Sequence, residues 1–156
     1  MLDQNTSAQL KTLLERLEGP IELVATLNDS DKSAKIKELV EEVAALSDLV
    51  TARFDGKNRR APSFGIAKAG EEPRVFFAGL PMGHEFTSLI LALLQTSGYA
   101  PKVSDEVLTS IKELGVNSHF DVFVSLSCHN CPDVVQALNL IAIYNPGATT
   151  TMIDGA

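Results

Sequence analysis

The residues best suited to chemistry are the only two cysteines of the 156-residue chain, Cys128 and Cys131. A thiolate attacks disulfides, and a second thiol at this spacing can then close a disulfide with the first. An apolar, β-prone run over residues 120–126 leads into the pair, and an apolar, helix-periodic run over 134–143 leads away from it. A strand that ends in Cys-x-x-Cys and turns directly into a helix indicates a redox-active dithiol of the thioredoxin-like kind.

The order of the two cysteines predicts their roles. Cys128 would lie just before the first helical turn, where unpaired N–H groups and the helix dipole favour negative charge. We therefore expect its pKa to lie below the usual value of about 8.5, and we assign it as the attacking thiol. Cys131 would be the resolving thiol, more buried inside the helix, and Pro132 suits the first helical position. His129 could stabilise the thiolate when protonated, or could be an exposed turn residue.

Other interpretations of the cysteine pair are weaker. A structural disulfide across so short a loop removes little unfolded-state entropy. A zinc site would need a second Cys or His pair at ligand spacing, and haem attachment would need His where Pro132 stands. Two inert buried thiols are the remaining alternative. The sequence therefore predicts no metal site and favours redox use.

Composition narrows the classes of partner. The net charge of −7 and the pI near 4.9 argue against nucleic acid, which needs a basic face. The N-terminus lacks the pattern of a signal peptide, and the apolar run 89–94 is too short to span a bilayer. We therefore expect a cytoplasmic protein that does not enter a membrane.

The glycines of 79–83 are not followed by the Lys-Ser/Thr of a phosphate-binding loop.

Hydrophobic periodicity predicts a repeated α/β pattern. Expected helices cover 2–17, 31–47, 84–95, 103–114 and 134–144, and expected strands cover 21–27, 49–54, 61–66, 74–78, 120–126 and 149–153. A βαβ unit followed by a hairpin and a helix is the thioredoxin-like topology. After Ser97-Gly98 the pattern restarts, and residues 125–128 align in type with 26–29. The first copy has Asn28-Asp29 where the second has its cysteine.

The predicted fold is therefore α/β, with two fused thioredoxin-like folds whose mixed sheets are flanked by helices. The first fold would cover 1–98, carry no dithiol and serve a structural role. The second would cover 99–156 and carry the dithiol, and its C-terminal half would be truncated.

Several runs resemble one family. Residues 125–139, Ser-Leu-Ser-Cys-His-Asn-Cys-Pro-Asp-Val-Val-Gln-Ala-Leu-Asn, are similar to the N-terminal domain of the alkyl hydroperoxide reductase flavoprotein, AhpF. So are 20–27, 61–64 and 83–89, and the resemblance covers the whole chain. It implies two fused thioredoxin-like folds with one dithiol in the second.

The resemblance also implies a function. The dithiol would take electrons from a Cys-x-x-Cys in the flavoprotein body, which NADH reduces through FAD. It would pass them to the disulfide of a partner peroxiredoxin, as part of an NADH-dependent peroxide-detoxifying enzyme. The chain itself would bind no cofactor, and the parent protein would be a homodimer. The resemblance further implies a cis bond at Pro62 and a Glu85 that relays a proton near the dithiol. Alternatively, Glu85 only complements a helix dipole.

Two other functions stay open at the level of sequence. The chain could be a docking or structural module whose thiols are idle, or a general glutaredoxin- or thioredoxin-like reductase of small disulfides. Reversible oxidation of the two thiols would distinguish a peroxiredoxin reductase from the docking module. Selectivity for a peroxiredoxin over insulin-like or glutathione disulfides would distinguish it from the general reductase.

Overall fold

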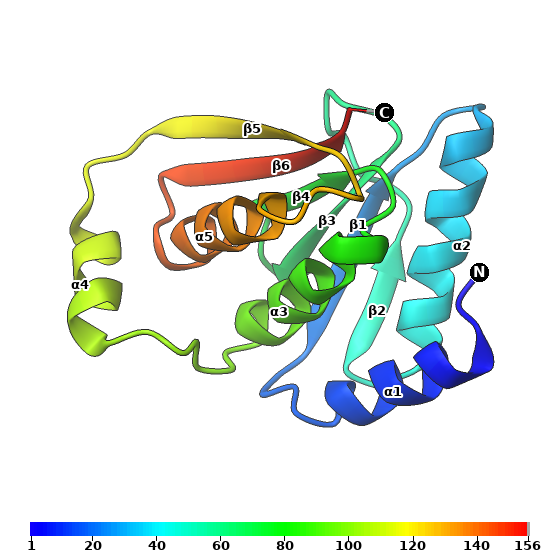
Figure 1. Cartoon of the computed structure of the whole chain (residues 1–156), viewed down its shortest axis with the longest axis horizontal. Helices are drawn as coiled ribbons and strands as arrows, with labels where there is room; N and C mark the ends of the chain where they lie inside the picture. Colours follow the sequence, from blue (N-terminus) through cyan, green and yellow to red (C-terminus); the bar gives the residue numbers. More distant parts are fainter. Residues whose placement is uncertain (156) are drawn as a thin grey trace.

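The computed structural model describes residues 1–155 and has the element order that the sequence predicts (Figure 1). The elements are α1 (Gln4–Leu14), β1 (Ile21–Thr26), α2 (Asp31–Ala45), β2 (Val50–Arg53), β3 (Ser63–Lys68), β4 (Val75–Ala78), the 3-10 helix η1 (Gly83–Glu85), α3 (Phe86–Thr96), α4 (Asp105–Glu113), β5 (Ser118–Val124), α5 (Cys131–Tyr144) and β6 (Ala148–Asp154).

Polar residues at the expected places start three of the helices. The side chain of Asp3 accepts a hydrogen bond from the backbone N–H of Thr6 at the start of α1. Ser30 and Ser104 cap α2 and α4 in the same way. These caps satisfy N–H groups that have no partner inside the helix.

The strands form a single mixed sheet in the order β2-β1-β3-β4-β6-β5. Within residues 1–98, which the sequence predicts to be the first repeat, β1 pairs parallel with β2 and antiparallel with β3, and β3 pairs antiparallel with β4. The sequence predicted a mixed sheet in each fold. Instead β6 pairs parallel with β4 as well as with β5, so the sheet is continuous through both repeats. This pairing covers the N–H and C=O groups that β4 would otherwise expose at an edge.

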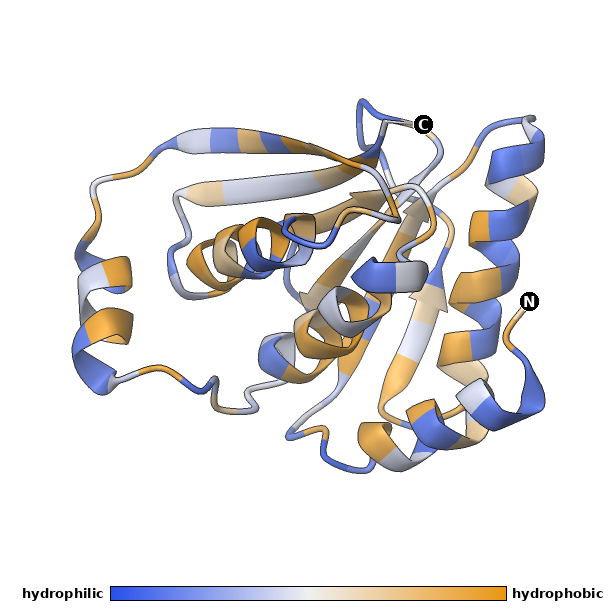
Figure 2. Cartoon of the chain, in the orientation of Figure 1, coloured by the Kyte–Doolittle hydropathy of each residue, from blue (hydrophilic) through white to orange (hydrophobic). Residues whose placement is uncertain are grey.

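One hydrophobic core extends across both repeats. Phe64 and Phe77 stack at its centre with ring centroids 5.4 Å apart. Figure 2 shows β1, β3 and β4 mostly in hydrophobic colours and α2 banded in both, as expected for a helix with one face toward the sheet. From the second repeat, Val124, Val135, Ala142 and Met152 join this core. The dithiol segment is thus anchored to the first repeat by packing as well as by strand pairing.

Helices α3 and α5 lie side by side in front of the sheet (Figure 1), and they make direct contact. Helix α5 also contacts β4, β5, β6 and η1. The N-terminus of α5 is therefore held at the carboxyl end of β5, beside η1 of the first repeat. This boundary between the repeats positions the two cysteines.

Candidate redox site

Cys128 and Cys131 form a disulfide at the start of α5, with their Cα atoms 5.6 Å apart. The turn before the helix is closed by the Cys128 N–H, which donates to the Ser125 carbonyl at 3.0 Å. The backbone N–H of Cys131, the first residue of α5, donates to the Cys128 sulfur at 3.3 Å. An N–H at a helix N-terminus stabilises negative charge on its acceptor. The geometry therefore favours a thiolate on Cys128 once the disulfide is reduced.

The two cysteines differ in what they pack against. The sequence pattern predicted that Cys131 would be more buried, inside the helix; both residues are half-buried, and Cys131 is the one that packs against the hydrophobic core. Helix α5 begins at Cys131, with Asn130 as the residue before it and Pro132 in its first turn. Cys131 is therefore the first helical residue and not an interior one. The two cysteines differ further in that the Cys128 sulfur accepts the N–H of Cys131.

The first repeat braces the loop that carries the dithiol. The N–H of His84 in η1 donates to the carbonyl of Leu126 at 3.2 Å. The rings of His84 and His129 lie 4.5 Å apart between centroids, with tilted planes. Gly83 has φ of +58°, and a Cβ placed there would lie 3.0 Å from the Leu126 oxygen. Only glycine allows so close an approach in this backbone conformation.

Glu85, the last residue of η1, is fully buried at 0% exposure. The Ser88 hydroxyl donates to its Oε1 at 2.7 Å, while its Oε2 has no hydrogen-bond partner among residues 1–155. Burial raises the pKa of Glu85, against the opposing effects of the Ser88 hydrogen bond and the charge of His84. A buried carboxyl with a raised pKa keeps its proton to higher pH than an exposed one, and such groups often occur at functional sites.

The carboxyl of Glu85 reaches the dithiol helix through Ser88. The Gln136 amide on α5 donates to the Ser88 hydroxyl at 3.2 Å, so Glu85, Ser88 and Gln136 form a polar chain across the boundary between α3 and α5. No hydrogen bond joins Glu85 to either cysteine in the described residues. The structure therefore brings together the predicted residues Cys128, Cys131 and His129, and it connects Glu85 to their helix indirectly.

Pro62 lies in the loop before β3. The peptide bond between Ala61 and Pro62 is cis, the geometry that the resemblance implied. The residue lines a cavity that Leu126 of the dithiol loop also lines. The loop before β3 and the dithiol loop therefore face a common space.

Comparison with known proteins gives relatives over the full length of the chain. It is 51% identical over 156 residues to the alkyl hydroperoxide reductase F subunit of Pseudomonas putida. This match covers 100% of the present chain and 30% of the Pseudomonas putida protein. It is 53% identical over 156 residues to the F subunit of Escherichia coli K12, covering 99% of this chain and 30% of that protein. The chain belongs to the family of the N-terminal domain of AhpF. It spans about a third of the length of these curated relatives. No family model matches.

Solved structures agree with this relationship to AhpF. The NTD_N/C domain of AhpF from Enterococcus faecalis matches with a TM-score of 0.87 and 27% identity, over 99% of this chain and 80% of that one. A protein disulfide oxidoreductase from Aeropyrum pernix shares the fold with a TM-score of 0.79 at 18% identity, covering 98% of this chain and 76% of that one. The chain is thus a thioredoxin-like redox domain of the AhpF family, and the predicted fold class is confirmed.

Residues 1–155 contain neither a membrane-spanning helix nor a cluster of metal ligands. None of their helices is long and apolar enough to cross a membrane. Nor do three or more His, Cys, Asp or Glu side chains gather anywhere among them in a way that could hold a metal ion.

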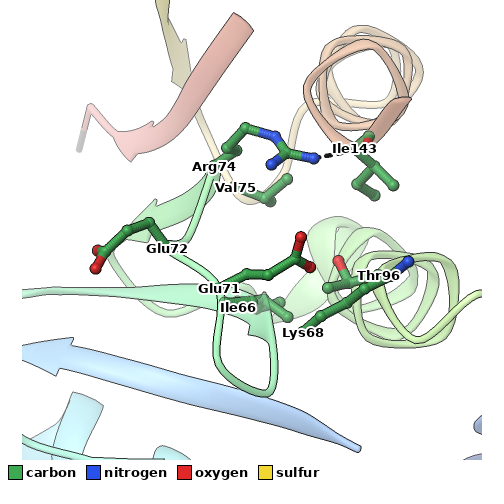
Figure 3. A pocket seen from close by; sticks show the side chains of 9 residues that line it. Ile66, Lys68, Glu71, Glu72, Arg74, Val75, Thr96 and Ile143 are labelled. Carbon is green, nitrogen blue, oxygen red and sulfur yellow. Dashed lines mark hydrogen bonds between the residues drawn. The ribbon is translucent and has the colours of Figure 1, made fainter. Parts of the chain in front are cut away.

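The residues that connect the AhpF-type dithiol helix to the first repeat were not predicted from the sequence. Arg74 donates from Nε to the Ala142 carbonyl at 2.7 Å, near the end of α5. From a terminal nitrogen it donates to the Ile143 carbonyl at 2.9 Å (Figure 3). The spacing of Glu85 and Ser88 could have revealed that pair, because residues three apart share a helix face. Nothing local in the sequence indicates that Arg74 or Gln136 crosses between the repeats.

Proposed function

We propose that this chain is the dithiol–disulfide exchange domain of an AhpF-type reductase. It accepts electrons from a dithiol of the flavoprotein body and reduces the disulfide of a partner peroxiredoxin in peroxide detoxification. Family membership supports this proposal, because the relatives are F subunits of alkyl hydroperoxide reductase. The observation that carries it is the Cys131 N–H pointing at the Cys128 sulfur, which makes Cys128 the better nucleophile.

Two exchange steps follow from this geometry. The Cys128 thiolate attacks one sulfur of the partner disulfide, so a mixed disulfide forms and one partner thiolate leaves. The Cys131 thiolate then attacks the Cys128 sulfur, which restores the intramolecular disulfide and releases the second partner thiolate. The partner gains two electrons, and the dithiol of this chain loses two. Each departing thiolate takes up a proton according to its own pKa.

Recharging runs the same exchange in the opposite direction. A dithiol in the flavoprotein body attacks the Cys128–Cys131 disulfide and is itself oxidised. In the parent protein, the resemblance implies that NADH and FAD supply the two electrons for this dithiol. The residues of the present chain act only on sulfur and on protons.

His129 and Glu85 are assigned supporting roles. His129 follows Cys128 directly, so its positive form would favour the adjacent thiolate by charge. Glu85 would take up or release a proton at the boundary with α5, since its raised pKa and its link through Ser88 to Gln136 suit a proton reservoir. The first repeat braces the dithiol loop through η1. At the position equivalent to the dithiol, it has no cysteine.

Trapping the mixed disulfide tests the proposal. A reduced Cys131→Ser protein mixed with oxidised peroxiredoxin should give a covalent adduct that dithiothreitol releases, visible on a non-reducing gel. Cys128→Ser should give no adduct and no electron transfer. Insulin and glutathione disulfides serve as competing substrates, and the peroxiredoxin should react fastest. A Cys128→Ser protein that still reduces the partner would contradict the assignment.

A further inference from the structure

A cavity lies beside the dithiol loop but outside the reacting residues. It is a cavity of about 550 Å³ between the start of α2, the loop of residues 59–62, the end of β4, Leu126 and the end of β6. Pockets of about 300–1,000 Å³ are typical of ligand-binding sites. None of the exchange steps above uses this cavity. We call it the interrepeat cavity.

The lining of the interrepeat cavity has a charge opposite to that of the chain. The chain carries a net charge of −7, yet the cavity is lined by Lys32, Lys35, Arg59 and Arg60, against the one carboxylate of Asp154. Of these cations, Arg60 is engaged with Asp121 at 3.2 Å. The other three take part in none of the ion pairs found among residues 1–155. Such a concentration of cations attracts negative groups and raises the rate of encounter with them.

The rest of the lining is apolar. Ile36 and Ile153 are 1% and 8% exposed, and Leu80 and Leu126 are half-buried. A simple inorganic anion would gain nothing from these surfaces. An extended peptide that carries acidic and aliphatic side chains satisfies both parts of the lining, because alternate side chains point in opposite directions.

The position of the cavity connects it with the exchange reaction. Leu126 lines the cavity and lies two residues before Cys128. Two residues of chain span at most about 7 Å, so a segment that contacts Leu126 passes close to the reacting sulfur. A substrate could therefore occupy the cavity and present a disulfide to Cys128 at the same time.

We propose that the interrepeat cavity binds an acidic, extended segment of the redox partner next to its reactive disulfide. The proposal rests on the proposed function, since it names the part of the partner that the silent first repeat recognises. Lys32 and Arg59 bind carboxylates of the segment, and the aliphatic floor takes its apolar side chains. The first repeat is then a substrate-recognition element as well as a scaffold.

Charge reversal in the cavity tests the recognition step. The double variant Lys32→Glu with Arg59→Glu should lower kcat/KM for an oxidised peroxiredoxin by about tenfold or more, mostly through KM. Its rate toward the neutral hydroxyethyl disulfide should stay within about twofold of wild type, because the dithiol is unchanged. The matched control, Lys11→Glu with Arg16→Glu on and just after α1, makes the same change of charge on exposed residues and should affect neither substrate. An unchanged kcat/KM for the peroxiredoxin, or an equal loss toward both disulfides, would overturn the proposal.

A binding measurement keeps this test independent of the redox function. A fluorescein-labelled peptide with alternating Asp and Leu should bind the wild-type chain in an anisotropy titration, with an affinity that falls as salt is added. The Lys32→Glu, Arg59→Glu variant should lose binding by about tenfold, and the α1 control should keep it. If the peptide binds but the peroxiredoxin is not reduced, the proposed binding role of the cavity holds and the proposed function fails. If wild type and variant bind the peptide equally, the proposed binding role is refuted, whatever the reductase activity.

Discussion

Replacing the buried Glu85 with Gln should separate its effect on stability from its effect on exchange. At neutral pH, one oxygen of the Glu85 carboxyl is buried without a partner among residues 1–155, and burial raises the pKa of this group. An unsatisfied buried polar group costs about 1–3 kcal/mol, and a charged one costs more. Gln keeps the acceptor for the Ser88 hydroxyl and removes the charge, but its NH2 group takes the place of the unpaired oxygen. The gain is therefore the cost of the charge alone, and we expect Glu85→Gln to raise the unfolding free energy at pH 8 by about 1 kcal/mol.

The pH dependence gives the sign of this effect. Because the pKa of Glu85 is higher in the folded than in the unfolded protein, the folded state holds its proton to higher pH. The resulting stabilisation is complete below the unfolded pKa of about 4.3 and is lost as pH rises through the folded pKa. The difference between Glu85→Gln and wild type should therefore be small in acid and should grow with pH. Other carboxyls titrate in both proteins and cancel in that difference.

Urea unfolding between pH 4 and pH 8 measures the effect on stability, and single-turnover reduction of the partner disulfide measures the effect on function. If Glu85 moves a proton, Glu85→Gln should slow exchange by about 100-fold even as it stabilises the fold. Ser88→Ala provides a control, because the lost hydrogen bond should raise the pKa of Glu85 further and shift the pH window upward. A Glu85→Gln protein that is less stable than wild type by the same amount at every pH would refute the reasoning.

Two further substitutions test how the first repeat holds the dithiol segment. Arg74→Ala removes two hydrogen bonds from the guanidinium to the carbonyls of Ala142 and Ile143. It should lower the unfolding free energy measured in urea by about 2–4 kcal/mol, and Arg74→Lys should lower it by less. A change under about 0.5 kcal/mol would show that the contact is not formed in solution. Gly83→Ala places alanine in a left-handed backbone conformation and adds a Cβ 3.0 Å from the Leu126 oxygen. The loss of unfolding free energy should therefore exceed the about 1–2 kcal/mol expected from the backbone conformation alone, and the midpoint potential of the dithiol should change. Gly70→Ala, at φ of +86° with nothing within 4 Å of the added carbon, should show the backbone cost without a shift in potential, and equal effects at both glycines would count against the brace.

The local structure was predictable from sequence, whereas the contacts between the repeats were not. Apolar spacing predicted α2 from a stripe of five residues. Four of them are buried and Leu46 is partly buried against the core; the four are Ile36, Leu39, Val40 and Val43. The Cys-x-x-Cys spacing likewise identified the turn before α5. These features were predictable because they depend on the spacing of residues within one element.

Long-range features needed the structure because their partners are far apart in the chain. The pairing of β4 with β6 joins residues that are 75 positions apart, such as Val75 and Thr150, and no pattern in either strand specifies it. Glu85, as an acidic residue near the start of a helix, is expected to be exposed, yet it is fully buried. The interrepeat cavity is built from five separate segments, so its concentration of cations is invisible in a sequence whose net charge is negative.

Cys128 and Cys131 should act as a reversible two-electron carrier. A titration of the pair against dithiothreitol or glutathione buffers, read by thiol trapping and mass spectrometry, tests this role most directly. We predict a single reversible two-electron midpoint near or below about −250 mV, in the range of reducing thioredoxin-like proteins. Thiols that stay unpaired, or a disulfide that stays intact, across the whole range of buffers would contradict this role and leave the chain as a docking module with idle cysteines.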